Sequence, residues 1–165
     1  MKWILFTIIT ILISGCSTHQ YSISELPIVS SSELSAIYIV PNNGADIYHI
    51  KDGKEIFLGK TGFSTGDFTF RYIVAKAKPG IYKFKAKKFS DETNITIEKG
   101  KTIILTEEPV WDTSSVIGMF GIPALVAITQ KQKLVFMEEN EGIEKILRFN
   151  GREGAKIEVP IVLEP

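Results

Sequence analysis

The clearest pattern of hydrophobic and polar positions in this chain lies at residues 82–87. Tyr82, Phe84 and Ala86 alternate there with three lysines. Successive side chains of a β-strand point to opposite faces of a sheet, so this period of two predicts a strand with one buried and one solvent-exposed face. The lysines on the solvent-exposed face also discourage edge-to-edge aggregation.

Similar short runs follow one another at a spacing of about ten residues, with turn residues between them, which is typical of an all-β sandwich. The Lys51-Asp52-Gly53 turn is one example, because Asp-Gly between two alternating runs is a strong hairpin signal. Glu141 and Gly142 are predicted to turn the last pair of strands. The sequence therefore predicts an all-β fold, mainly an antiparallel, immunoglobulin-like β-sandwich. The expected strands cover residues 36–40, 45–50, 54–58, 68–74, 82–87, 93–97, 101–106, 133–137 and 143–149, with 156–163 as a further candidate for extended structure.

Residues 116–128 break this rhythm, because they form an apolar run without a charge. Proline is tolerated at the first position of a helix, so Pro123 predicts one short apolar helix at about residues 123–131. An apolar run of this length is usually core, and it would then close one end of the sandwich. Alternatively, an exposed apolar patch would dock an envelope protein or the membrane surface. Trp111 would frame that patch, and its anchors would be Met119, Phe120, Ile122, Leu125 and Val126.

The N-terminus carries the signals of export. Met1 and Lys2 give a short positive start, and an apolar run follows over residues 3–13. This run fits the apolar region of a secretory signal peptide but is too short for a membrane-spanning helix, which needs about 20 residues. It ends in Ile13-Ser14-Gly15-Cys16, which resembles the lipobox of bacterial lipoprotein precursors.

The lipobox resemblance implies that residues 1–15 are removed and that Cys16 carries the lipid. Cys16 is the single cysteine of the chain, so lipidation also accounts for an otherwise unpaired thiol in an exported protein. Several acyl chains on one residue would hold the protein stably on the bilayer. Because Ser17 and not Asp follows the cysteine, the resemblance implies the inner leaflet of the outer membrane, facing the periplasm.

The charge balance excludes one class of partner. The chain has 19 basic and 19 acidic residues and a formal net charge of zero. Nucleic-acid-binding proteins usually carry a basic surplus, so we expect no nucleic-acid partner. The serine-rich stretch that follows Cys16 is typical of a flexible tether. The expected organisation is a signal peptide at 1–15, a lipidated tether at 16–34, a β-sandwich at 35–149 and a C-terminal extension at 150–165.

A series of turn motifs over about residues 35–149 resembles those of a known family. The motifs are Asp52-Gly53-Lys54, then Gly59-Lys60-Thr61, then Lys78-Pro79-Gly80-Ile81-Tyr82, then Glu98-Lys99-Gly100-Lys101-Thr102. Together they resemble small bacterial lipoproteins of the DUF2846 type and the related PEGA-like sandwiches. Val40-Pro41 stands where that group often has Arg-Pro. The resemblance implies a sandwich fold and brings no catalytic residues with it.

Several candidate chemistries fail on spacing or context. Gly59-Lys60-Thr61 lacks the first glycine of a phosphate-binding loop, and no helix is expected to follow it, so we expect no nucleotide site. Asp46, His49 and Asp52 do not alternate onto one strand face, so we expect no metal there. The carboxylate pairs at 107–108 and 138–139 are expected to be solvated turn residues.

These observations favour a lipid-anchored, non-enzymatic binding or accessory module without a cofactor. Its partners would be the membrane, through the lipid on Cys16, and an envelope protein, through residues 116–128. One alternative is a small envelope hydrolase centred on His49, although a surface or half-buried strand histidine is the simpler interpretation because no nucleophile motif accompanies it. Another is a glycan- or peptidoglycan-binding domain that uses Tyr48, Tyr72 and Tyr82, which fit a core equally well.

Overall fold

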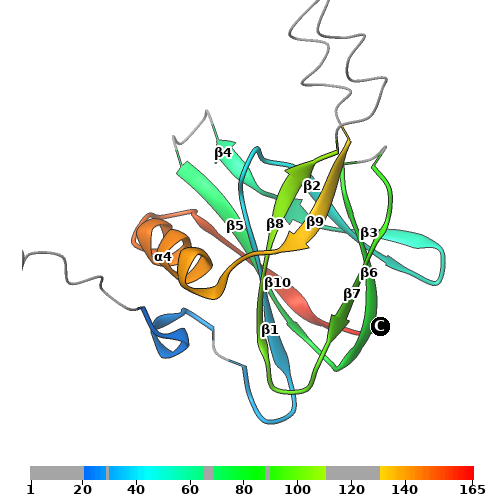
Figure 1. The fold of residues 1–165 in the computed structure, drawn as a ribbon, viewed down its shortest axis with the longest axis horizontal. Coiled ribbons are helices and arrows are strands. Elements are labelled where there is room, and N and C mark those ends of the chain that lie inside the picture. Colours follow the sequence, from blue (N-terminus) through cyan, green and yellow to red (C-terminus); the bar gives the residue numbers. More distant parts are fainter. Residues whose placement is uncertain (1–20, 29, 65–68, 88–89, 111–130) are drawn as a thin grey trace, which may run out of the picture.

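The computed structural model describes residues 21–28, 30–64, 69–87, 90–110 and 131–165, and Figure 1 shows their arrangement. Strands dominate, and one α-helix lies against the outside of the sheet. The elements are η1 (Ile23–Glu25), β1 (Ser35–Val40), β2 (Asp46–Lys51), β3 (Lys54–Lys60), β4 (Gly62–Ser64), β5 (Thr69–Ala77), β6 (Gly80–Ala86), β7 (Thr93–Ile97), β8 (Thr102–Pro109), β9 (Gln132–Phe136), α4 (Glu139–Asn150) and β10 (Lys156–Leu163). Among these residues, no helix is both long and apolar enough to cross a bilayer.

The strands form one mixed, nearly closed 10-stranded sheet in the order β10-β5-β1-β8-β9-β6-β2-β3, with β4 paired to β5 and β7 paired to β6. Most neighbours are antiparallel, but β1 pairs with β8 and β10 pairs with β5 in parallel. The all-β class is therefore confirmed, whereas the immunoglobulin-like sandwich is not. The local alternation that predicts strands carries no information on which strands become neighbours.

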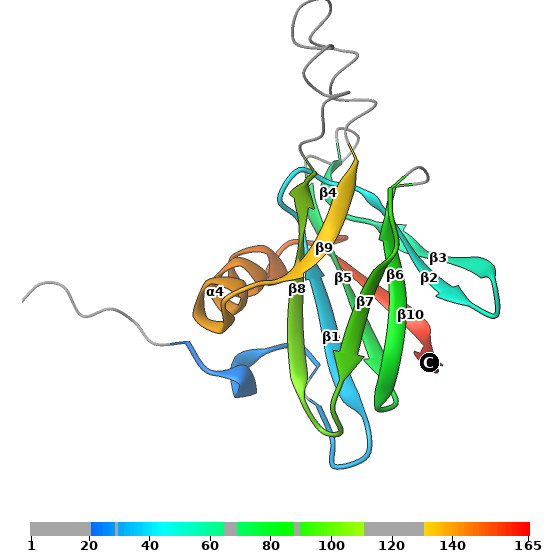
Figure 2. The same cartoon turned by 45° about the vertical axis from the view of Figure 1, so that its right-hand side comes forward.

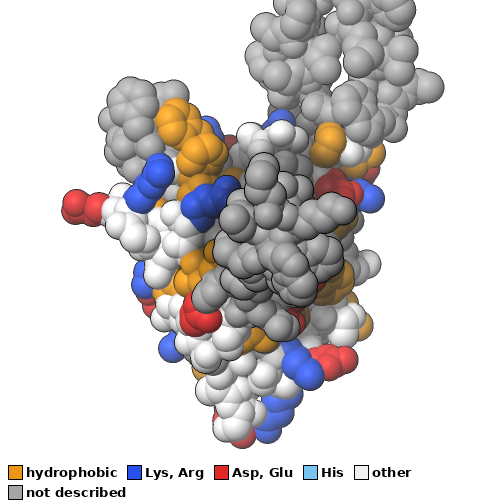
Figure 3. Space-filling model, turned by 60° about the vertical axis from the view of Figure 1, so that its left-hand side comes forward, with side chains coloured by type: hydrophobic (Ala, Val, Ile, Leu, Met, Phe, Trp, Pro, Cys, Tyr) orange, Lys and Arg blue, Asp and Glu red, His pale blue; other side chains and the backbone are white. Residues whose placement is uncertain are grey.

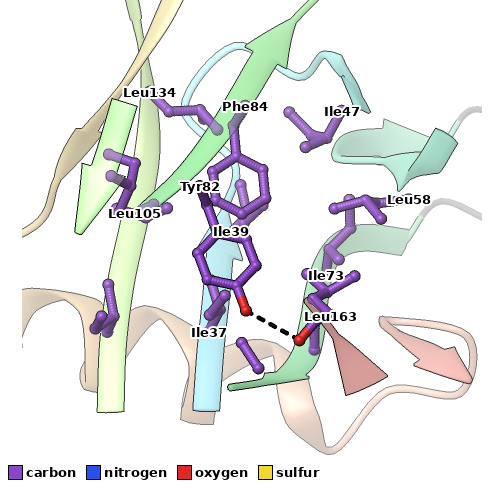
Figure 4. Packing of buried hydrophobic residues seen from close by; sticks show 14 of the residues in the cluster. Ile37, Ile39, Ile47, Leu58, Ile73, Tyr82, Phe84, Leu105, Leu134 and Leu163 are labelled. Carbon is purple, nitrogen blue, oxygen red and sulfur yellow. Dashed lines mark hydrogen bonds between the residues drawn. The ribbon is translucent and has the colours of Figure 1, made fainter. Parts of the chain in front are cut away.

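The inside of this curled sheet holds the main core, part of which is drawn in Figure 4. Tyr82, Phe84 and Ala86 point into it, as their alternation predicts, and none is more than 1% exposed. The Tyr82 hydroxyl lies 2.8 Å from the carbonyl oxygen of Lys78 and 2.9 Å from that of Leu163, so it can donate to either. The segment predicted as a C-terminal extension thus supplies β10, whose end is held against the core.

A second apolar cluster lies on the outer face of β1, β5 and β8, beneath α4. It explains why all six residues of β1 are buried, since one set faces the main core and the other faces the helix. Residues of the predicted tether join this cluster, because Leu26 is buried and Tyr38 Oη donates to the carbonyl oxygen of Ile28 at 2.6 Å. The second half of the predicted tether therefore packs on the sheet.

The prediction of a strand at 143–149 and a turn at Glu141 and Gly142 is wrong, because both lie inside α4. Ile143 and Ile146 are one helical turn apart and are buried against the sheet. The Glu138 side chain accepts from the Glu141 backbone N–H at 3.1 Å and caps the first turn. Gly142 permits close packing, since a Cβ there would come within 2.6 Å of the Ile104 side chain.

Candidate functional site

The residues proposed from sequence for lipidation and docking lie outside the described residues. These are Cys16, Trp111, Met119, Phe120, Ile122, Leu125 and Val126. Residues 123–130 of the predicted apolar helix also lie outside them. The alternatives that invoke His49, the tyrosines and the carboxylate pairs can be compared with the structure directly.

His49 lies in the core and is only 1% exposed, so the prediction of a surface or half-buried histidine is wrong. Its ring packs against both Tyr82 and Phe84, with centroid distances of 5.3 and 5.6 Å. Burial lowers the pKa of His49 below its ordinary value, and the positive charge of Lys51 adds to this shift. Nε2 has no hydrogen-bond partner among the described residues. An imidazole buried against these rings is out of reach of a substrate at the surface.

The three tyrosines proposed for a glycan do not form one surface. Tyr72 and Tyr82 are completely buried, and burial raises the pKa of Tyr82 to about 12. Tyr48 is half-buried on the outer side of β2, where its ring lies 5.4 Å from that of Phe57. Only Tyr48 of the three is therefore accessible to a sugar.

The expectation that the carboxylate pairs are solvated turn residues is wrong for Glu107. This residue lies on β8 and has no exposed surface. Its carboxylate accepts from the Thr61 hydroxyl and from the Asn42 backbone N–H, the latter at 2.7 Å. Thr61 belongs to the Gly59-Lys60-Thr61 triplet, and its backbone and side chain also bond to Ala45. This polar cluster joins β3, β8 and the connection after β1. Within the described chain, no set of His, Cys, Asp and Glu residues could hold a metal ion.

An opening in the sheet lies where β7 and β8 diverge (Figure 2). The two strands are consecutive in the chain, yet they do not pair with each other. Most Cα atoms of β7 lie more than 8 Å from those of β8. Paired strands lie about 4.8 Å apart, so the sheet has an opening here. We call it the β7–β8 slot, bounded by residues 95–97 of β7 and residues 102–104 of β8.

Strand β9 fills the part of the opening above this slot. It pairs with β8 from Pro109 to Leu105 and touches β6 at Ala86. It ends at Phe136, and the backbone N–H of Met137 then donates to the carbonyl oxygen of Ile104 at 2.9 Å. From there the chain leaves the sheet towards α4 (Figure 2). Along residues 102–104, β8 therefore has a strand neighbour on the β1 side only.

A hollow of about 350 Å³ marks the slot. Its apolar lining includes Ile103, Ile104, Phe136 and Met137, and its polar rim includes Thr96, Glu98, Lys101 and Glu139. Phe136 shares the strand parity of buried Leu134, but it is 62% exposed. Side chains two residues apart on a strand share a face, so Phe136 is exposed because the wall beside it is incomplete.

A second exposed apolar group lies beside the end of α4, where Figure 3 shows hydrophobic side chains near β4 and β5. The rings of Phe63 and Phe70 are 5.1 Å apart, and Phe70 stacks on Phe149 at the same distance. This group is a surface ridge, whereas the β7–β8 slot combines apolar side chains with an unpaired strand edge. The slot is therefore the better candidate for a binding site.

Sequence reasoning predicted the strands around the slot but missed the slot itself. The predicted strands at 93–97, 101–106 and 133–137 correspond to β7, β8 and β9. Nothing in their residue types reveals that β7 and β8 separate, because that depends on which strands pair. In comparisons with known proteins, no family model, no curated protein and no solved structure matches this chain.

Proposed function

We propose that this chain is a lipid-anchored, non-enzymatic binding module of the bacterial envelope that holds a partner protein at the β7–β8 slot. The observation that carries this proposal is the hollow of about 350 Å³ at an unpaired strand edge, beside the exposed Phe136 ring. Exposed apolar surface next to unsatisfied strand edges is typical of protein-docking sites. This proposal moves the expected partner contact from residues 116–128 to the slot.

A binding role fits the buried polar groups better than a catalytic role does. His49 has no access to solvent, and the Glu107 carboxylate already accepts hydrogen bonds from Thr61 and Asn42. A general base must be within hydrogen-bond reach of a substrate proton. Neither residue meets this requirement, so we propose that both stabilise the fold.

The anchor rests on the N-terminal sequence. The proposed lipid on Cys16 would hold the module at the membrane, and the residues before Tyr21 would separate the folded part from the bilayer. Labelling cells with an alkyne analogue of palmitate tests this directly. We expect label on the wild-type protein and none on a Cys16→Ala variant. Equal labelling of both proteins, or of neither, would contradict the anchor.

Site-specific photocrosslinking in cells tests the binding role. A photoreactive phenylalanine analogue would replace Phe136 in one sample and Phe57 in a matched control, because these side chains have similar exposures of 62% and 56%. We expect position 136 to crosslink to one envelope protein that position 57 does not reach. Identical crosslinks from both positions, or none from position 136, would contradict a partner at the slot.

A further inference from the structure

We propose that the β7–β8 slot binds an extended polypeptide segment of the partner, which inserts as an additional strand between β7 and β8. The segment would pair with the edge of β8 that β9 leaves free, below the point where β9 ends. This inference deepens the proposed function and rests on it. Its basis is the coincidence of three features, which are strand spacing, backbone direction and side-chain character.

The two strands lie too far apart to pair with each other, which is the first condition for a further strand to enter between them. Neighbouring strands lie about 4.8 Å apart, so two strands that flank a third are separated by about twice that distance. Most Cα atoms of β7 lie more than 8 Å from every Cα atom of β8, although residues 98–101 alone connect the two strands. Above the slot, β9 lies between β8 and β6, and it touches the same edge of β6 that β7 uses farther along.

The backbone of β8 presents hydrogen-bonding groups to the slot. The Ala36 N–H donates to the carbonyl oxygen of Lys101 at 3.0 Å, so the peptide groups of odd-numbered residues in β8 face β1. The Ile104 carbonyl oxygen accepts from Met137 on the other side, so even-numbered residues face away from β1. Thr102 is two residues before Ile104, and its N–H and C=O therefore point into the slot.

Neither backbone group of Thr102 has a partner within the described part of the chain, because the β9 register begins at Leu105. On the opposite side, β7 uses one edge to pair with β6 from Gly80 to Phe84, and its other edge faces the slot. Two facing strand edges offer alternating donors and acceptors. A polypeptide strand matches this arrangement along its length, as in other cases of strand addition.

The side chains around the slot define the kind of segment that fits. Ile103 and Phe136 lie on its inward side, whereas Thr96 is exposed on the outward side. The rim carries both signs of charge, with Glu98 and Lys101 at the turn and Glu139 at the start of α4. We therefore expect about three to four residues with apolar side chains facing inward, polar side chains facing outward and little net charge.

A random 12-residue peptide library displayed on phage would be selected against the purified full chain in detergent. Enriched peptides would be synthesised with a fluorescent label, and their affinities would be measured by fluorescence anisotropy.

The decisive pair of variants is Thr102→Pro and Thr102→Val. Both lose the hydroxyl, but only proline loses the N–H that faces the slot. Proline is tolerated as the first residue of a strand, which is the position of Thr102 in β8.

We expect enriched peptides to alternate apolar and polar residues and to bind Thr102→Val within about twofold of wild type. Thr102→Pro should bind them at least about tenfold more weakly, since about one charge-neutral hydrogen bond and its geometry are lost. Peptide binding should also slow hydrogen exchange at the Thr102 amide. Phe136→Asp should weaken binding, whereas Phe57→Asp should not.

Peptides methylated on alternate backbone nitrogens test the same contact without altering the protein, and this remains decisive if Thr102→Pro does not fold. Because alternate N–H groups of an inserted strand face β8 and β7, methylation in either register should weaken binding relative to the unmethylated peptide. Undiminished binding of a peptide methylated in either register, equal binding to the two Thr102 variants, or no enriched peptide would overturn strand insertion. A dimer of this chain that Thr102→Pro abolishes would also overturn it, because the occupant would then be a second copy.

Failure of this inference is distinguishable from failure of the proposed function. If position 136 still crosslinks to an envelope protein in cells that carry Thr102→Pro, the module binds a partner but not by strand insertion. If position 136 crosslinks to nothing in either background, the binding role itself fails.

Discussion

The curled sheet has two places where strands meet without pairing, and they differ in what fills them. One is the β7–β8 slot. The other is the β3–β10 seam, where the two ends of the strand order approach each other. At the seam, Ile157 of β10 packs against the core and lies close to Gly59 of β3. At the slot, the corresponding space is a hollow.

Ion pairs strengthen the seam further. Glu164, which follows β10, accepts from Lys78 at 2.7 Å and from Lys51 at 3.0 Å. These contacts link the end of β10 to the β2–β3 turn and to the residues before β6. The comparison teaches that an unpaired strand edge is not by itself a binding site. Side chains decide whether the edge is closed, and only the slot leaves backbone groups and apolar surface together.

The largest expected effect is at the seam, from replacing Gly59 with valine. A Cβ at Gly59 would come within 3.1 Å of Ile157 and 3.2 Å of Ile73, and the φ of +152° disfavours a branched side chain. We expect a loss of about 2–4 kcal/mol in the free energy of unfolding from overpacking and backbone strain. Urea unfolding measures it. Gly151→Ala is the control, since nothing lies within 4 Å of its Cβ, and equal losses in both variants would contradict the tight seam.

Truncation of one apolar side chain at each place sharpens the comparison. We expect Ile157→Ala to cost about 1–2 kcal/mol, because half-buried Ile157 packs on the core. Phe136→Ala removes a larger side chain, but it should change stability by less than about 0.5 kcal/mol because the ring is mostly exposed. Denaturant unfolding of both variants checks this. A larger loss at Phe136 would mean that the slot is packed and closed.

The main core, which borders both the slot and the seam, contains the buried His49, and this residue predicts a pH dependence of stability. Burial lowers the pKa of His49, so below pH 6.5 the unfolded chain binds this proton more readily than the folded chain. Stability should therefore fall as the pH drops below 6.5, and part of this slope should disappear in His49→Leu. Thermal unfolding between pH 5 and 8 compares the two proteins, and identical slopes would show that His49 does not contribute.

The smallest expected effect concerns the ion pairs of the seam. Hydrogen bonds from Lys78 and Lys51 lower the pKa of Glu164 to about 2. The stabilisation is then present above pH 4.5 and is lost as the pH falls towards 2. Because Glu164 is solvent-exposed, Glu164→Gln should lower the melting temperature only slightly, and high salt should remove the difference. A large, salt-independent loss would indicate a packing role instead.

The strands were the most predictable part of the fold, because their signal is local. The alternation at 82–87 identified both β6 and its buried face, and Asp52-Gly53 identified the β2–β3 turn. The helix at 139–150 was missed although Ile143, Ile146 and Leu147 have the helical spacing i, i+3 and i+4, because the surrounding rhythm of short strands was extended over it. Ion pairs four residues apart, Glu141 with Lys145 and Glu144 with Arg148, were the available helical signal.

The candidate site was much less predictable. His49 and Glu107 were expected at accessible positions, yet both are buried. Their burial depends on partners far away in sequence, such as Thr61 for Glu107, which lies 46 residues earlier. Phe136 was predicted within a strand, but its exposure follows from tertiary structure, because at this position β9 pairs with β8 on one side and with no described strand on the other.

The sequence by itself determined the all-β class, the position of most strands and the inward face of β6, because alternation and turn chemistry act over a few residues. Only the tertiary structure decided which strands are neighbours, that β1 and β8 run parallel, and that β7 and β8 separate. The physical reason is that sheet pairing joins backbone groups, which are nearly the same at every residue. The choice of partner therefore depends on how the side chains of the whole chain pack together, and the slot exists only as a result of that packing.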